Sequence, residues 1–406
     1  MTRKKKTARR YADDLRGASR LVVDATKRVT DVVQGMHQVI ASGPAVLGRP
    51  LAAPVRALTA LVYGSIRGVV HGIGSGIDAA LGQLAPLLGD GVPGPQRAAL
   101  LAALNGVVGD VLAETGNALA IEMALHHDGQ LLELDQRVLR DDLPGAGGKL
   151  LVLLHGSSVD DSCWQRAGHP DRDHGTALAH DLGYTPVYLA YNSGLHVSTN
   201  GRAFAEMLDR LVGEWPAPIT ELVLLGHSMG GLVARSACHH AEATGQAWRA
   251  KLTRLVCLGT PHHGAPLERS GNLVDLILGL SSYSAPLSQL GKLRSAGITD
   301  LRYGNVLDEH WEGRDRFAHA ADPRHTALLP TGVRCYAVAA TKTAKPRPKL
   351  RSDGMVPVDS ALGRHPKAEL TLAFPLEHQW IGYAMGHLDL LSRAEVYQTL
   401  HAWLAS

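Results

Sequence analysis

One serine of this sequence lies in a pattern that can make its hydroxyl a nucleophile. The segment Gly226-His227-Ser228-Met229-Gly230 follows the apolar run 222–225 and leads into the helical pattern 231–237. A serine at such a strand–turn–helix junction has a strained backbone and an exposed hydroxyl, and flanking glycines let strand and helix approach closely. In a chain with 44 glycines the motif alone is weak evidence, and its setting makes it specific. We therefore predict that Ser228 is the nucleophile.

A nucleophilic serine at such a junction is followed along the chain first by an acid and then by a histidine. Asp353 comes after the apolar run 333–340 and a basic, Pro-rich loop, and Gly354 beside it permits a tight turn. Asp359 is the alternative acid. We predict that Asp353 orients the histidine and stabilises its charged form.

The predicted base is His387, which lies between the last predicted strand and the terminal helical pattern. With 21 histidines in the chain, its position and not its residue type is the argument, and His378 is the competitor. His387 would take the proton of the serine hydroxyl and pass it to the leaving group.

The attacked carbonyl oxygen becomes negatively charged and needs hydrogen-bond donors. One predicted donor is the backbone N–H of Met229, at the start of a helix whose dipole favours negative charge. The other is the N–H of Ser157, in the loop 155–158 that directly follows the apolar run 150–154. The alternative for His155-Gly156 is a plain turn.

Three more histidines lie close to these motifs. We predict that His227 points away from the nucleophile, and that the segment 259–264, with His262 and His263, is a loop that closes the next strand. A metal site at His262 and His263 would need further ligands, which the sequence does not provide at a suitable spacing. We therefore predict structural roles for all three.

The elements that must position these residues alternate between strands and helices from about residue 124. Two short runs around Asp128-Gly129, 123–127 and 130–134, predict a hairpin. Apolar runs that are each followed by a helical segment predict strands at 150–154, 186–191, 221–225, 252–258, 333–340 and 369–374. This order predicts an α/β fold with a mostly parallel sheet, helices on both faces and an antiparallel hairpin at its start.

The first 122 residues differ in texture from the rest. Residues 1–10 carry six basic side chains and no acid, which indicates a solvated tail or, alternatively, an arm for membranes or polyanions. Residues 11–122 predict a helical extension of about three segments, the third from Arg97 to about Met123. It either packs on the catalytic domain, 123–406, or presents an amphipathic surface to lipid.

One connection inside the predicted catalytic domain is unusually long. Residues 266–330 contain the apolar helical run 273–280. Such an insert is typical of a lid or cap over an active site, and it is equally compatible with an ordinary helix and extra turns.

Composition narrows the class of protein. With 45% hydrophobic and 19% charged residues, the 406-residue chain is typical of a globular protein with a large core. The net charge of +3 argues against nucleic acid as the main partner. We find no secretory signal and no apolar run long enough to span a membrane, and four scattered cysteines without a CxxC pair. We therefore expect a cytoplasmic protein, with the pairing of the cysteines left open.

Six segments together resemble a known group of proteins. They are HGSS at 155–158, YNSGLHVSTNGR at 191–202, GHSMGGL at 226–232, GTPHHGAPLER at 259–269, SDGMVP at 352–357 and GHLDLL at 386–391. The chain from about residue 124 to 406 resembles bacterial lipase/esterase-like α/β-hydrolases, and is similar to the GPI-inositol-deacylase-like group. The resemblance implies an α/β-hydrolase fold and ester hydrolysis through an acyl-enzyme, without a cofactor. Ser228, Asp353 and His387 match the triad positions.

We expect a carboxylic-ester hydrolase, an esterase or lipase that acts on lipid-like or medium-chain acyl esters. Among enzymes, a thioesterase or acyltransferase with the same triad is the alternative. From another class, a non-catalytic lipid- or granule-binding protein is the alternative, although all three triad residues are present. The sequence leaves the natural ester and the oligomeric state open.

Overall fold

The computed structural model describes residues 95–165, 173–265, 294–315, 322, 324–325, 327–346 and 351–406. The predictions for the basic tail, for the first two helical segments and their contact with lipid, and for the apolar run 273–280 lie outside these residues. The described residues belong to two compact units. The larger unit comprises residues 102–110 and the described residues from 121 onward, and the smaller one includes residues 95–101 and 111–120.

Eight strands form one sheet in the order β2-β1-β4-β3-β5-β6-β7-β8. Their bounds are β1 (Ala124–His127), β2 (Gln130–Leu131), β3 (Lys149–Leu154), β4 (Thr185–Ala190), β5 (Glu221–His227), β6 (Leu252–Leu258), β7 (Arg334–Thr341) and β8 (Gln379–Tyr383). The strands β3 to β8 are parallel, and β1 is antiparallel to both β2 and β4. Asp128 and Gly129 have φ of 48° and 72°, as the tight hairpin turn requires. The predicted mostly parallel sheet with an antiparallel hairpin at its start is confirmed.

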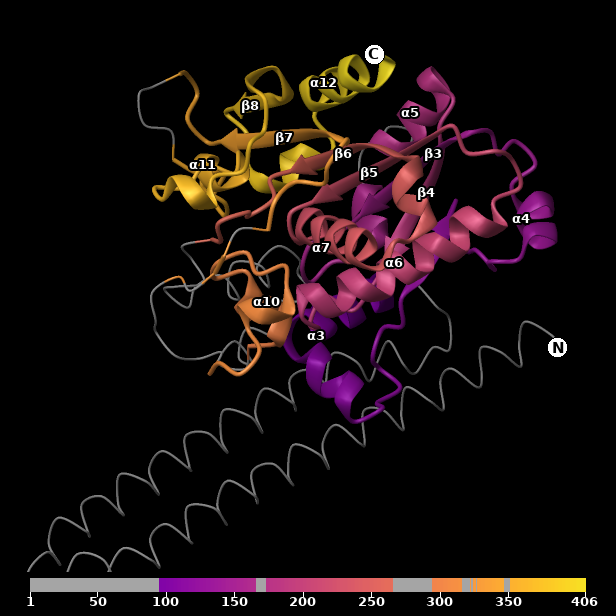
Figure 1. The fold of residues 1–406 in the computed structure, drawn as a ribbon, viewed down its shortest axis with the longest axis horizontal. Helices are drawn as coiled ribbons and strands as arrows, with labels where there is room; N and C mark the ends of the chain where they lie inside the picture. The colour runs from indigo at the N-terminus through magenta and orange to yellow at the C-terminus, as the bar shows by residue number, and fades with distance from the viewer. Residues whose placement is uncertain are drawn as a thin grey trace, which may run out of the picture. The chain divides into compact units, whose positions relative to one another are not determined.

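Helices cover both faces of this sheet (Figure 1). On one face lie α5 (His174–Leu182) and α12 (Ala394–Ala405), and on the other α6 (Val197–Glu214) and α7 (Met229–Thr244). The remaining helices are α3 (Pro95–Glu114), α4 (Gln136–Asp142), α10 (Ala296–Asp300) and α11 (Val358–Ala361). Short 3-10 helices are η2 (Asp161–Trp164), η3 (Ala247–Lys251), η5 (Asp308–His310), η6 (Ala368–Leu370), η7 (Leu376–His378) and η8 (His387–Leu391). The central strands are mostly apolar because both of their faces are buried.

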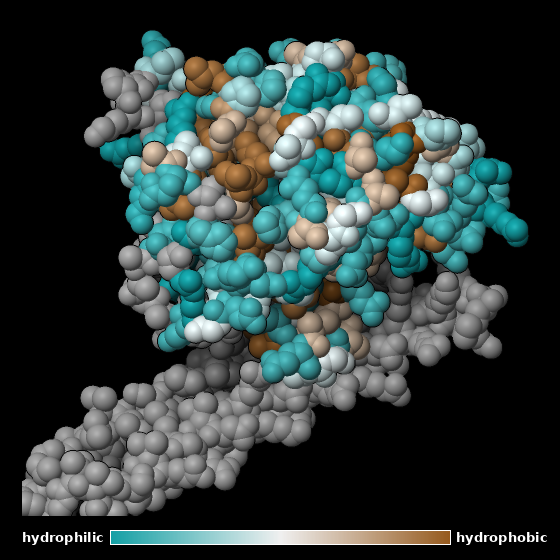
Figure 2. Space-filling model, in the orientation of Figure 1, coloured by the Kyte–Doolittle hydropathy of each residue, from teal (hydrophilic) through white to brown (hydrophobic). Residues whose placement is uncertain are grey.

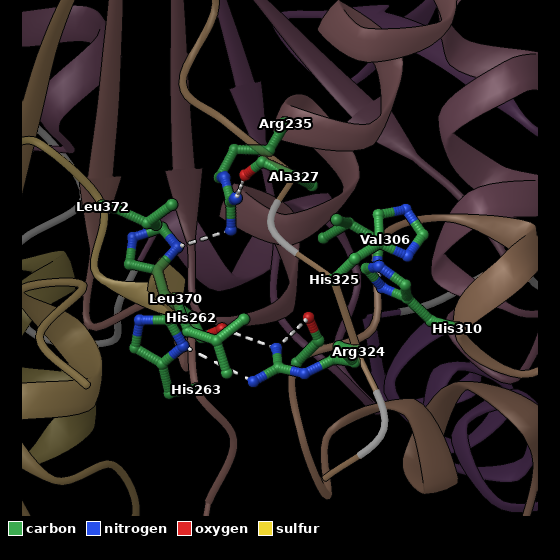
Figure 3. Close-up of a pocket in the computed structure, with 11 residues that line it drawn as sticks. Arg235, His262, His263, Val306, His310, Arg324, His325, Ala327, Leu370 and Leu372 are labelled. Carbon is green, nitrogen blue, oxygen red and sulfur yellow. Dashed lines mark hydrogen bonds between the residues drawn. The ribbon is translucent and has the colours of Figure 1, made fainter. Parts of the chain in front are cut away.

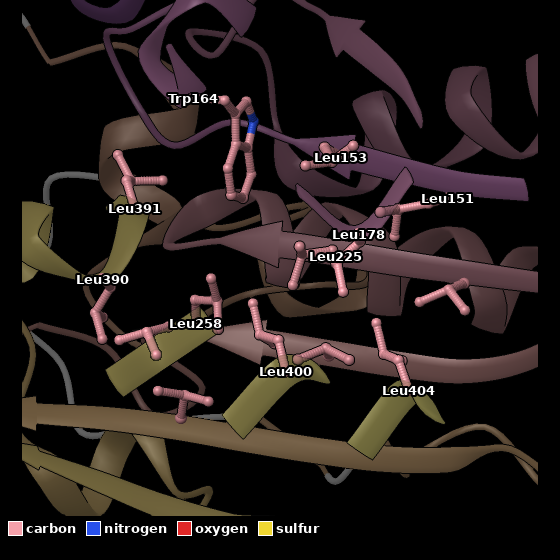
Figure 4. Packing of buried hydrophobic residues seen from close by; sticks show 14 of the residues in the cluster. Leu151, Leu153, Trp164, Leu178, Leu225, Leu258, Leu390, Leu391, Leu400 and Leu404 are labelled. Atoms are coloured by element: carbon pink, nitrogen blue, oxygen red, sulfur yellow. The ribbon is translucent and has the colours of Figure 1, made fainter. Parts of the chain in front are cut away.

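A hydrophobic core fills the space between the sheet and the helices α5 and α12 (Figure 4). Leu151 and Leu153 of β3 point to the same face, since side chains alternate along a strand. They belong to one buried cluster with Leu225 of β5, Leu178 of α5 and Leu400 of α12. This packing fixes the strands, and therefore the loops that leave their carboxyl ends.

Two predicted elements are wrong. The segment 369–374 is not a strand, although Leu370, Leu372 and Phe374 alternate with exposed residues as in a strand. Their apolar face is buried without joining the sheet, and the last strand is β8, further along the chain. The third predicted helix ends at Glu114 and not near Met123, because Gly116 adopts a left-handed conformation with φ of 59°.

The four cysteines carry free thiols, so the disulfides that the sequence left open are not formed. Burial raises the pKa of Cys238 and of Cys257 to about 12, which keeps these thiols protonated at neutral pH.

Hydrophilic residues cover much of the surface in Figure 2, with a hydrophobic patch toward the upper left of the view. None of the described helices combines the length and the apolar composition that crossing a membrane requires.

Candidate active site

Ser228 lies at a sharp turn between β5 and α7. Its φ of 54° and ψ of −121° are strained for a residue with a side chain. The glycines on both sides have the predicted steric role. A Cβ atom at Gly226 would lie 2.5 Å from the Gly231 nitrogen, and one at Gly230 would lie 2.4 Å from the Leu154 carbonyl oxygen. The strand and the helix therefore approach each other as closely as the sequence predicted, with Ser228 at their junction.

His387 and Asp353 form a buried pair. Nδ1 of His387 lies 2.7 Å from Oδ2 of Asp353, and the two residues are 5% and 1% exposed. The other carboxylate oxygen, Oδ1, accepts hydrogen bonds from the N–H groups of Met355 and Val356, at 2.8 and 2.7 Å. Because a carboxylate only accepts, Nδ1 carries the proton, which leaves Nε2 as an acceptor. Nε2 has no hydrogen-bond partner among the described residues.

The imidazole of His387 lies beside the end of β6. A Cβ atom at Gly259 would lie 3.0 Å from Cε1 of His387, so only a glycine fits there. Ser228 is tied to the same place, because its N–H donates to the Leu258 carbonyl at 2.8 Å. The structure thus brings Ser228, His387 and Asp353 to one edge of the sheet, where β5, β6 and β7 end.

The alternative acid and base lie elsewhere. The side chain of Asp359 is 74% exposed and lies 3.9 Å from Arg364. Nδ1 of His378 lies 3.2 Å from the carbonyl of Cys335, at the beginning of β7. Neither residue contacts His387 or Ser228 in the described hydrogen bonds, so the geometry favours Asp353 and His387.

The predicted oxyanion donors follow neighbouring strands. β3 and β5 are paired with Leu154 opposite Gly226, so Ser157 and Met229 follow adjacent strand ends. The N–H of Met229 is in the first turn of α7, where helix geometry provides no intrahelical acceptor. The N–H of Ser158, by contrast, donates to Oγ of Ser193 at 2.9 Å. The structure therefore keeps Ser157 and Met229 as the candidate donors.

His155 fixes the shape of this loop. Its Nδ1 donates to the carbonyl of Gly156 at 2.7 Å, and its Nε2 accepts from the N–H of Tyr191 at 3.3 Å. The ring stacks on that of Tyr191 with centroids 4.2 Å apart. Burial lowers the pKa of His155, which agrees with the neutral ring that these two hydrogen bonds require.

The family comparison agrees with this geometry. A family model described as PGAP1-like alpha/beta domain matches residues 196–328, which include β5, Ser228 and β6. The sheet order and the strand–turn–helix setting of Ser228 are those of the α/β-hydrolase fold. The protein has an α/β-hydrolase fold. The resemblance to lipase/esterase-like hydrolases and to the GPI-inositol-deacylase-like group is confirmed.

Solved structures of α/β-hydrolases are similar at low identity. The mature lipase BlEst2 of Bacillus licheniformis is 16% identical with a TM-score of 0.41, and the match covers 63% of this chain and 92% of that one. Lipase B of Aspergillus fumigatus is 11% identical with a TM-score of 0.38, covering 70% and 56%. Esterase B of Lactobacillus rhamnosis is 13% identical with a TM-score of 0.35, covering 69% and 78%. No curated protein matches the sequence.

Part of helix α3 contacts the loops at the edge of the sheet that holds Ser228, which the sequence analysis did not predict. Oγ of Ser295 donates to the carbonyl of Gly106 at 2.6 Å, and Nδ2 of Asn192 donates to that of Gly109 at 2.9 Å. A Cβ atom at Gly106 would lie 1.9 Å from Oγ of Ser158. The glycines of α3 at positions 106 and 109 are the sequence signal that could have indicated this close approach.

His227 also contacts the candidate base of the α/β-hydrolase. Its Nε2 lies 3.2 Å from the carbonyl oxygen of His387, and the two rings have centroids 4.7 Å apart. His227 therefore contacts η8 at the position of the candidate base. The sequence analysis expected a structural role for His227 but not this contact.

Proposed function

We propose that this protein is a serine carboxylic-ester hydrolase. The observation that carries the proposal is the buried His387–Asp353 pair at 2.7 Å, which leaves Nε2 of His387 as an acceptor at the sheet edge that holds the strained Ser228. This is the arrangement that general-base activation of a serine needs. The match to the PGAP1-like domain, which includes Ser228, supports it.

In the proposed reaction, Oγ of Ser228 attacks the carbonyl carbon of the ester while its proton moves to Nε2 of His387. The N–H groups of Ser157 and Met229 hold the negative oxygen of the tetrahedral intermediate. The alcohol leaves with the proton from His387, and an acyl-enzyme remains. Water, deprotonated by His387, then releases the acid and restores the serine.

Asp353 has a positioning role in this reaction. Its Oδ2 holds the imidazole in the tautomer with the proton on Nδ1, and stabilises the charged ring that forms during proton transfer. The N–H groups of Met355 and Val356 fix its other oxygen, so the carboxylate cannot rotate away.

Lipid-like or medium-chain acyl esters are the proposed substrates. The support is the resemblance of the sequence to lipase/esterase-like hydrolases, together with the apolar run at 273–280 in the long connection after β6. The cytoplasmic location stays a prediction.

The test is hydrolysis of p-nitrophenyl esters from acetyl to palmitoyl by the wild type and by Ser228→Ala. We expect kcat to fall at least about a thousandfold in Ser228→Ala, since the nucleophile is removed. Ser236→Ala is the matched control, because Ser236 is a buried serine of the same helix, two turns beyond Ser228.

Equal rates in the wild type and Ser228→Ala, or an inactive wild type on every chain length, would contradict the proposal. A parallel series of acyl thioesters separates the esterase from the thioesterase. The wild type should prefer the oxygen esters in kcat/KM.

A further inference from the structure

A second group of polar residues lines a cavity that includes none of the proposed catalytic residues (Figure 3). Part of this cavity is open to solvent. Its basic lining residues are Arg235, Arg324, His262, His263, His310 and His325. They come from α7, from the loop after β6, from η5 and from the segment before β7, so folding alone brings them together.

Arg235 is a buried cation without a carboxylate. Its Nη1 contacts Nδ1 of His262 at 3.2 Å, and its Nη2 donates to the carbonyl of Ala327. No carboxylate among the described residues lies within ion-pair distance of Arg235. Two other arginines with buried side chains differ, since Arg324 is paired with Asp322 at 2.8 Å and Arg254 is paired with Glu221. A buried, uncompensated guanidinium is costly unless a counter-ion joins it.

Among the basic side chains that line the cavity, the atoms left without a hydrogen-bond partner are donors. A guanidinium only donates, so Nδ1 of His262 accepts and Nε2 carries the proton. Nδ1 of His310 accepts from the N–H of Val306 at 3.3 Å, so its Nε2 also carries the proton. These two Nε2 atoms and Nε of Arg235 are buried and have no partner among the described residues. Unpartnered N–H groups on residues of one cavity favour a guest that supplies acceptors.

The same charges exclude a metal cation. Arg235 and Arg324 both repel a cation at this place, and the described residues contain no cluster of His, Cys, Asp or Glu suited to a metal ion. Burial, together with Arg235 and Arg324, lowers the pKa of His263 to about 4 and that of His310 to about 3. Both imidazoles are therefore neutral near pH 7, and the positive charge of the cavity resides on the arginines.

We propose that this cavity binds a phosphate-type oxyanion, either free phosphate or the phosphate group of a larger ester. Such an anion neutralises Arg235 and offers several acceptors to the unpartnered N–H groups. Leu370 and Leu372 provide an apolar wall for the remainder of a phosphate ester. The site goes beyond ester hydrolysis, because it contains neither Ser228 nor His387.

The test is a titration of the full-length protein with inorganic phosphate by calorimetry, at constant ionic strength set with sodium chloride. We expect saturable binding to one site in the wild type, and at least about tenfold weaker binding to Arg235→Gln, which loses the charge. Arg249→Gln is the matched control with unchanged affinity, because Arg249 is an arginine outside the cavity that is paired with Glu242 at 2.6 Å. Ser228→Ala should bind phosphate like the wild type, which separates this site from the proposed hydrolytic one.

Absence of saturable phosphate binding in the wild type, or equal affinity in Arg235→Gln and the wild type, would overturn the proposal. Circular dichroism checks that Arg235→Gln is folded. If it is not folded, the affinity of His262→Phe for phosphate is measured instead. This variant removes a donor and keeps a ring of similar shape, and we expect it to bind phosphate more weakly than the wild type.

Two further ligands separate the sources of the phosphate group. Glycerol 3-phosphate represents a soluble ester, and vesicles of phosphatidic acid in phosphatidylcholine represent a lipid headgroup. Binding of glycerol 3-phosphate without vesicle co-sedimentation assigns the site to soluble phosphates. Co-sedimentation that free phosphate competes away, and that Arg235→Gln lacks, assigns it to the lipid.

Discussion

Helix α7 connects two polar regions of this molecule that are organised in opposite ways. Ser228 immediately precedes its first turn, and Arg235 lies two turns further along. Around Ser228, the carboxylate of Asp353 is held by His387 and by two backbone N–H groups, and Nε2 of His387 is an acceptor without a partner among the described residues. Around Arg235, the unpartnered side-chain atoms of the described lining residues are donors, and no carboxylate of the described residues lies within ion-pair distance. The first region is prepared to take a proton, and the second to receive an anion.

The comparison also shows how differently such regions are encoded. The residues of the catalytic edge each follow the end of a strand, where a sequence pattern can reveal them. The residues of the cavity lie on a helix interior and on irregular segments, where no pattern marks them. The predictions below test whether the two regions are as distinct as this contrast implies.

The largest effect is expected for Asp353→Asn. The amide removes the charge and favours the wrong tautomer of His387, so we expect kcat to fall by about ten-thousandfold on a p-nitrophenyl ester. Asp359→Asn should leave kcat unchanged, because that side chain is exposed and its described ion pair is with Arg364 and not with His387. Similar activity of Asp353→Asn and the wild type would mean that another acid serves His387.

A smaller loss of activity is expected for Gly106→Val, which tests whether α3 belongs to the catalytic edge. A Cβ atom there would lie 1.9 Å from Oγ of Ser158 and 2.8 Å from its Cα, so a different rotamer of Ser158 does not relieve the clash. A displaced oxyanion loop should lower kcat about ten- to a hundredfold. The matched control is Gly213→Val, since Gly213 lies in α6 with no atom within 4 Å of the added Cβ.

Unchanged kcat in a folded Gly106→Val protein would show that α3 packs near the loop without positioning it. The measurement is kcat and KM together, with thermal unfolding to confirm the fold. A rise in KM alone would place the effect on substrate binding and not on the oxyanion.

The smallest expected effect is on the free energy of unfolding at mildly acidic pH, to which His263 of the cavity contributes. The pKa of His263 is lowered from 6.5 to about 4, first by burial. As the pH falls below 6.5, the unfolded chain takes up this proton before the folded one does, so stability decreases toward pH 4. His263→Asn should remove about 1 kcal/mol of the stability lost between pH 7.5 and 5.5.

Urea unfolding at the two pH values measures this difference. His180→Asn is the control, because the side chain of His180 is 88% exposed and should not alter the pH dependence. An identical pH dependence in His263→Asn and the wild type would show that His263 does not carry a depressed pKa in the folded state.

Much of the fold was predictable because its signals are local. The central strands are continuous apolar runs, and the hairpin is marked by Asp128-Gly129. The segment 369–374 was predicted wrongly for a physical reason. Alternation of apolar side chains shows that one face is buried, but it does not show whether the backbone pairs with a strand or, as here, packs beside the sheet.

The sequence by itself determined the nucleophile motif, the order of serine, acid and histidine, and the parallel sheet, because glycine spacing and strand periodicity are properties of neighbouring residues. Only the tertiary structure decided that Asp353 and not Asp359 meets His387, that α3 reaches the oxyanion loop, and that Arg235 gathers histidines from distant segments. Those contacts join residues 27 to 92 positions apart, and their energies depend on burial and on missing partners, which no local pattern contains.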